Sequence, residues 1–99
     1  MNVLDQETLE KVAFVLKTIA HPLRIGIVDL LNKHEEQNVN QICSALDSEQ
    51  SSTSHHLQNM KLKGILGSRR DGKHIYYHLK VKEVTSVISC IEKCEKLPI

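Results

Sequence analysis

Apolar residues recur every three or four positions in the first third of the chain, which indicates two consecutive amphipathic helices. In the first stretch the apolar positions are Leu9, Val12, Ala13, Leu16, Ile19 and Ala20. Asp5 precedes them and is a suitable N-cap, so we expect this helix over residues 5–20. His21-Pro22 then interrupts the pattern, because proline disfavours helix at the preceding residue but fits the first turn of a new one. The second helix is predicted to end near Lys33.

A loop and two shorter helices are predicted in the middle of the chain. The polar residues 34–38 form the loop, and a short third helix follows. Its apolar positions are Val39, Ile42, Cys43 and Leu46. Residues 47–50 form a polar turn, and a fourth helix continues to about Lys63, where Gly64 suits a left-handed C-cap. The apolar side of this fourth helix is thin and consists of Thr53, Leu57 and Met60.

The other side of the fourth helix carries short hydrogen-bonding side chains, where a solvent-facing helix usually has Glu and Lys. These residues are Gln50, Ser51, Ser52, Ser54, His55 and Asn59. The run of Ser and Thr at positions 51–54 has poor helix propensity, so local stability does not explain it. Side chains of this kind suit close approach to base edges and phosphates. The fourth helix is therefore the candidate recognition element for a nucleic acid.

The last third of the chain predicts a β-hairpin and a final helix. Two strand-like runs within residues 66–79 flank Asp71-Gly72, a strong signal for a hairpin with a type I′ turn. The residues of the second run that are expected to pack inward are Ile75, Tyr77 and Leu79. A helix over about 81–96 follows, and its apolar stripe is Val84, Val87, Ile88 and Ile91. The pattern predicts a mainly α (α+β) fold: four helices, a β-hairpin and a C-terminal helix.

The charge of the chain is unevenly distributed, although its net value is only +1. Residues 1–54 hold four basic and eight acidic side chains, a net of −4, whereas residues 55–82 hold seven Lys or Arg and one Asp, a net of +6. Four of the six histidines lie in the same basic stretch. A basic block in an otherwise acidic chain is the charge pattern expected where phosphates dock.

Composition restricts the class of protein. A chain of 99 residues suits one compact domain over residues 1–99, and with 3% aromatic residues its core must consist of Leu, Ile and Val. Burial of a further face in a dimer would stabilise such a small core. We expect no membrane partner and a cytoplasmic location, because no apolar run reaches roughly 18–20 residues and the N-terminus lacks a signal-peptide pattern. Three cysteines do not suggest a secreted disulfide framework.

Three segments together resemble the ArsR/SmtB-type winged helix-turn-helix repressors. Residues 16–25 are similar to the start of that family's second helix, residues 54–66 to its recognition helix and exit, and residues 69–79 to its wing. The resemblance covers roughly residues 12–94. It implies a homodimeric transcriptional repressor that pairs through its first and last helices, here about 5–20 and 81–96, and binds an inverted-repeat operator in double-stranded DNA.

The resemblance also assigns contacts to individual residues. The recognition-helix contacts fall on Gln50, Ser51, Ser54 and His55, together with Ser52. The wing contacts, along the DNA backbone or minor groove, fall on Arg69, Arg70 and Lys73. Glu49 stands where the family often has a capping Ser, which leaves Ser48 as the expected substitute cap. His56 lies one helical step from His55, and we expect it to pack toward the core.

Many members of this family release DNA when they bind a metal or react at a thiol. The family's Cys-x-Cys metal site in the third helix falls here on Asn38 and Asn40, and Cys43 stands alone one turn later, where we expect a buried inert thiol. The family's zinc site in the last helix falls on Val81, Glu83, Cys94 and Leu97. Two of these four positions are apolar, so neither site is intact and no cofactor is required.

Cys90 and Cys94 are the remaining candidates for an effector site. They lie four residues apart on the last predicted helix and therefore share a face. Soft thiolates at this spacing could bind a soft metal ion such as Zn²⁺, Cu(I) or As(III), or respond to oxidants. Alternatively, both cysteines extend the apolar dimer stripe as small hydrophobic residues.

Two other classes of function fit the sequence less well than a DNA-binding repressor. A winged-helix module that docks a protein instead of DNA would show larger apolar or aromatic anchors on its recognition face. An enzyme is disfavoured because the chain has no nucleophile, base and orienting group at a recognisable spacing, and no glycine-rich phosphate loop.

Overall fold

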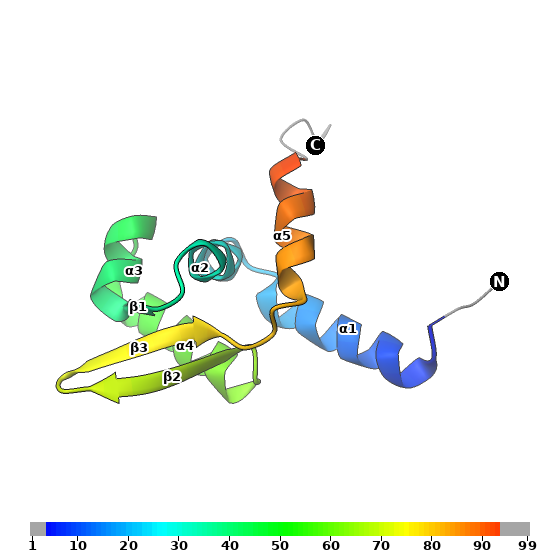
Figure 1. Cartoon of the computed structure of the whole chain (residues 1–99), viewed down its shortest axis with the longest axis horizontal. Helices are drawn as coiled ribbons and strands as arrows, with labels where there is room; N and C mark the ends of the chain where they lie inside the picture. Colours follow the sequence, from blue (N-terminus) through cyan, green and yellow to red (C-terminus); the bar gives the residue numbers. More distant parts are fainter. Residues whose placement is uncertain (1–3, 94–99) are drawn as a thin grey trace.

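The computed structural model describes residues 4–93, and for residues 87, 88, 91 and 92 it describes the backbone alone. The elements are α1 (Gln6–Ile19), α2 (Pro22–Lys33), β1 (Gln37–Asn38), α3 (Val39–Leu46), α4 (Gln50–Leu62), β2 (Leu66–Asp71), β3 (His74–Leu79) and α5 (Val84–Lys93). The predicted order of four helices, a hairpin and a final helix is confirmed. Figure 1 shows α2, α3 and α4 gathered with the sheet, while α1 and α5 extend away from this body.

Local capping explains where the first two helices begin. The Asp5 carboxylate accepts a hydrogen bond of 2.8 Å from the Thr8 amide, as predicted for the N-cap of α1. His21 caps α2 through its ring, because Nδ1 accepts a hydrogen bond from the Leu23 amide at 3.1 Å. Pro22 occupies the first position of α2, where its missing N–H has no consequence.

The connection between α3 and α4 is short. Asn38 and Gln41 form a reciprocal capping box at the start of α3, and Asp47, at φ 50°, ends that helix in the left-handed region. Glu49 is the N-cap of α4 but makes no side-chain capping bond. The prediction that Ser48 replaces it as a cap is wrong, because the Ser48 hydroxyl pairs with the Thr53 hydroxyl at 2.7 Å.

The sheet has three antiparallel strands in the order β1-β3-β2, so the predicted hairpin acquires a third strand that the sequence pattern did not indicate. β1 lies within the expected loop and pairs Gln37 with Tyr77. The hairpin pairs Asp71 with His74, so its two loop residues are Gly72 and Lys73 and not Asp71-Gly72. Only Gly72 of the two has a positive φ, 64°, which rules out the predicted type I′ turn.

The core lies between α2, α3, α4 and the inner face of the sheet. Its buried apolar side chains are Ile19, Ile27, Val28, Leu31, Ile42, Leu57, Met60, Ile65, Leu66, Tyr77, Leu79 and Val84. Tyr77 and Leu79 pack inward as predicted, but Ile75 is 37% exposed because it lies near the hairpin tip, beyond the reach of the helices. None of the helices within residues 4–93 is long and apolar enough to cross a membrane.

The final helix begins three residues later than the predicted residue 81. The amides of Lys80 and Val81 both donate to the Ile65 carbonyl, at 2.9 and 3.4 Å, which holds the chain in a turn before helix can start. Of the four residues in the predicted apolar stripe, the structure describes the side chain of Val84, and this side chain is buried. The side chains of Val87, Ile88 and Ile91 lie outside the described part of the chain, as does the whole of residues 94–96.

Candidate nucleic-acid interface

Helix α4 separates a fully buried face from an exposed polar one. Thr53, Leu57 and Met60 have no exposed surface, so the thin apolar stripe is sufficient to fix the helix on the core. On the opposite side the predicted contact residues Gln50, Ser51, Ser52 and His55 are exposed, and Ser54 is half-buried. Within the described residues, the fold therefore leaves most of this row of hydrogen-bonding groups open to solvent.

A second contact fixes α4 to the first two helices. The Arg24 Nε of α2 donates to His56 Nδ1 at 2.8 Å, and the Arg24 Nη1 donates to the Thr18 carbonyl of α1 at 2.8 Å. The His21 ring lies beside that of His56, with 4.4 Å between centroids. Burial lowers the pKa of His56, and the nearby Arg24, His21 and His55 lower it further. His56 is thus half-buried and bonded inward, in agreement with the packing role expected for it.

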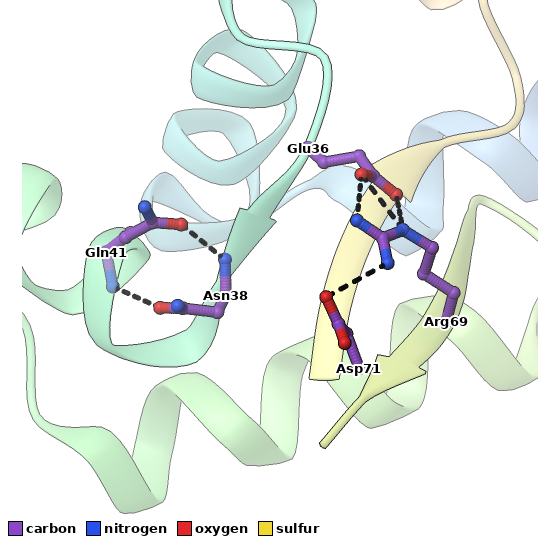
Figure 2. A network of polar contacts seen from close by, with 5 residues as sticks. All are labelled: Glu36, Asn38, Gln41, Arg69 and Asp71. Carbon is purple, nitrogen blue, oxygen red and sulfur yellow. Dashed lines mark hydrogen bonds and ion pairs between the residues drawn. The ribbon is translucent and has the colours of Figure 1, made fainter. Parts of the chain in front are cut away.

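The hairpin carries the three basic residues predicted to contact DNA, and they are not equivalent. Arg70 and Lys73 lie in its exposed outer part. Arg69 is 52% exposed at its side chain but is held by Glu36, with Nε–Oε2 at 2.8 Å and Nη2–Oε1 at 2.9 Å (Figure 2). Asp71 lies 3.8 Å from Nη1 of the same arginine. The guanidinium lowers the pKa of Glu36, chiefly through the hydrogen bonds.

Glu36 is a residue that inspection of the sequence missed. It belongs to the loop predicted at 34–38, and its only sequence signal is the acidic pair Glu35-Glu36. Its role depends on the pairing of β1 with β3, which brings it near Arg69, 33 residues later in the chain.

The residues predicted as candidates for an effector site lie on different elements. Asn38, where the family's Cys-x-Cys site begins, is the N-cap of α3. Cys43 is half-buried instead of fully buried, Cys90 is exposed on α5, and Cys94 lies outside the described residues. Among the side chains that the structure describes, no three from His, Cys, Asp or Glu are grouped so that they could hold a metal ion.

Comparison with known proteins identifies the family. A family model described as "Bacterial regulatory protein, arsR family" matches residues 21–67. The transcriptional repressor PagR of Bacillus anthracis is 40% identical over 88 residues, which span 89% of this chain and 88% of PagR. The chain belongs to the ArsR family. Another relative of similar length is the HTH-type transcriptional regulator YgaV of Escherichia coli (strain K12), which is 29% identical over 87 residues, 88% of each chain.

Solved structures of ArsR-type regulators share the fold. The crystal structure of PagR matches with a TM-score of 0.78 over 88% of this chain and 99% of that one. A solution structure from Mycobacterium bovis, described as a homodimeric winged helix-turn-helix DNA-binding domain of a possible ArsR-family regulator, matches with a TM-score of 0.73 at 28% identity, over 98% and 94% of the two chains. The protein is thus a winged helix-turn-helix transcriptional regulator, in which α3 and α4 form the helix-turn-helix and the β2–β3 hairpin is the wing. PagR and YgaV are both transcriptional regulators by name.

Proposed function

We propose that this ArsR-family protein is a homodimeric repressor that binds an inverted-repeat operator in double-stranded DNA, with one α4 in each of two major grooves. The observation that carries the proposal is the exposed polar face of α4, set on a helix whose other face is fully buried. An α-helix fits the major groove, and short side chains let its backbone approach the base edges closely. The basic wing beside it supplies contacts to the phosphates.

The contact residues follow from the chemistry of the α4 face. The amide of Gln50 can both donate to and accept from a base edge, and the His55 ring can contact a base or a phosphate. The hydroxyls of Ser51, Ser52 and Ser54 can donate to phosphate oxygens or bases. The one large apolar side chain exposed on α4 is Leu62, which is 85% exposed at the C-terminal end of the helix. A protein-docking module would show a cluster of apolar or aromatic anchors, so a single leucine beside the polar residues favours DNA.

The proposed second copy covers α1. This helix exposes large apolar side chains at Leu9, Val12, Phe14 and Leu16, with Leu4 just before it. A shallow apolar hollow lies between α1 and the start of α5, lined by Val12, Val15, Leu16, Val81 and Val84. Pairing of two copies across these helices would bury this surface and set the two α4 helices about one turn of DNA apart. A repressor of this kind acts in the cytoplasm, where the chromosome is.

The DNA-binding proposal is tested by removing the polar groups of α4 without disturbing its core face. Ser54→Ala combined with His55→Ala should lower affinity for a duplex selected from random DNA by the wild-type protein by at least about tenfold, since each lost base contact costs about 1–3 kcal/mol. His34→Ala combined with Ser44→Ala removes the same residue types from exposed positions elsewhere and should bind like wild type. Binding is measured by fluorescence anisotropy, and equal affinity of the two double variants would refute the assignment.

We also propose that a soft metal ion or a thiol reagent weakens DNA binding through Cys90 and Cys94, a proposal supported by their spacing and by the exposure of Cys90. Addition of Zn²⁺, As(III) or a mild oxidant to the wild-type complex should then release DNA. Cys90→Ser with Cys94→Ser should abolish that response, while Cys43→Ser should retain it. An unchanged response in the double variant would place the sensor elsewhere.

A further inference from the structure

The Glu36–Arg69 ion pair connects β2 to the residue just before β1, although β1 and β2 are not neighbours in the sheet. β1 and β2 lie on opposite sides of β3, and Arg69 pairs in register with Tyr76 of β3. Its guanidinium lies over the Tyr76 ring, 4.9 Å from the centroid, and reaches the carboxylate of Glu36 just before β1. Figure 2 shows both carboxylate oxygens of Glu36 facing the guanidinium. Two parallel N–H···O bonds of this kind fix orientation as well as distance.

The pair also links the wing to the helix-turn-helix. Two residues after Glu36, Asn38 ends β1 and caps α3 through its reciprocal bonds with Gln41, both 2.8 Å (Figure 2). The carboxylate that holds β2 therefore belongs to the segment that starts α3. β1 pairs with β3 at Tyr76 and Tyr77, and the outer part of the hairpin continues as a two-stranded ribbon. A ribbon of this kind is only marginally stable by itself, so the connection limits the motion of the outer wing relative to α3.

The charge around Arg69 is unfavourable for a phosphate contact. Glu36 and Asp71 surround its guanidinium, so the three side chains together carry a net negative charge. A phosphate oxygen approaching Arg69 would have to displace a bidentate carboxylate and would be repelled by Asp71. Arg70 and Lys73, in contrast, are exposed, and no acidic partner for either is found within residues 4–93.

We propose that Arg69 is a positioning residue that, with Glu36, clamps the wing in its DNA-binding orientation, and that Arg70 and Lys73 make the wing's phosphate contacts. This inference rests on the proposed DNA-binding function and gives Arg69 a role other than the DNA contact that the family resemblance implies for all three basic residues of the wing. It predicts that loss of the negative charge of Glu36 weakens DNA binding, although such a loss makes the protein more positive.

The sign of the effect of Glu36→Gln distinguishes positioning from contact. If Arg69 only positions the wing, Glu36→Gln should bind DNA about two- to five-fold more weakly than Glu35→Gln, which removes the same charge from the adjacent exposed residue. If Arg69 contacts a phosphate, Glu36→Gln frees the guanidinium and should bind more tightly than Glu35→Gln. Affinities are measured on the selected duplex over a range of salt concentrations, and thermal melting verifies that each variant is folded.

Two further substitutions distinguish a bidentate clamp from a simple positive charge. Arg69→Lys keeps the charge but cannot form two parallel bonds, so it should be as weak as Arg69→Gln. A lysine that restores wild-type affinity would overturn the proposal.

Arg70→Gln should lower the slope of log affinity against log salt concentration by about one for each lost phosphate contact. A wild-type protein that binds no duplex would refute the proposed function itself, whereas tighter binding by Glu36→Gln refutes only the clamp.

Discussion

At the scale of single residues, Arg24 connects three helices. One guanidinium nitrogen donates to the Thr18 carbonyl at the end of α1 and another donates to His56 Nδ1 on α4, while Arg24 itself belongs to α2. His56 can accept this bond only while Nδ1 is unprotonated, which in the neutral ring places the proton on Nε2. Protonation at Nδ1 would remove the acceptor and place two positive charges at hydrogen-bond distance. The orientation of the recognition helix is therefore linked to the protonation of a histidine on its inner side.

This arrangement makes part of the stability dependent on pH. The pKa of His56 is lowered in the folded protein by burial and by Arg24, so the unfolded chain binds more protons as the pH falls through the ordinary histidine pKa near 6.5. The contribution of His56 to the free energy of unfolding is fully present above the ordinary histidine pKa. This contribution is lost progressively as the pH falls from the ordinary pKa toward the lower pKa of His56 in the folded state. Urea denaturation at a fixed protein concentration should show the free energy of unfolding decreasing over this interval.

His56→Gln keeps an acceptor for Arg24 but cannot titrate, so the decrease should become shallower in that variant. His34→Gln, which replaces an exposed histidine, is the control and should retain the wild-type profile. Identical pH profiles for His56→Gln and the wild type would show that the decrease has another origin.

At the scale of elements, the sequence predicted what local chemistry determines. The Asp5 cap, Pro22 at the first turn of α2 and the buried stripe of α4 all lie where the pattern placed them. Each depends on residues within about one helical turn, which a sequence pattern contains. The same holds for the exposure of the polar face of α4, because the position of its buried face determines it.

Contacts between distant segments account for what the sequence could not predict. β1 has only two residues, and its strand conformation comes from pairing with β3 about 40 positions later. The hairpin loop is displaced by one residue because the register places Asp71 opposite His74. The start of α5 is delayed by amide bonds to Ile65, and the role of Glu36 depends on the position of β1. The pattern marked the exposed polar face of α4 and the basic hairpin, but it contained no sign of the Glu36 contact on which the separate role proposed for Arg69 depends.

At the scale of the whole molecule, most of the exposed large apolar side chains lie on or next to one element, α1. The polar face of α4 and the basic wing lie on the compact body of the protein, whereas the exposed apolar residues of α1 lie on an element that extends away from it (Figure 1). On α1, Val12 and Leu16 are 45% and 46% exposed, four residues apart and therefore on one face. A single recognition helix reads one half-site, so in the proposed dimer the apolar face of α1 would determine whether two half-sites are read together.

Val12→Lys combined with Leu16→Lys should therefore convert the proposed dimer into a monomer. Removing two apolar side chains from an interface costs about 1.5–3 kcal/mol for each, so the dimer dissociation constant should rise by about a hundredfold or more. Gln6→Lys with Glu10→Lys is the matched control, because it also places two lysines four residues apart on α1 but at exposed polar positions. Sedimentation velocity over a range of concentrations measures the association state. If both variants sediment as dimers at the concentration where the wild type does, the apolar face of α1 is not the interface, and the spacing of the two α4 helices must be set by another surface.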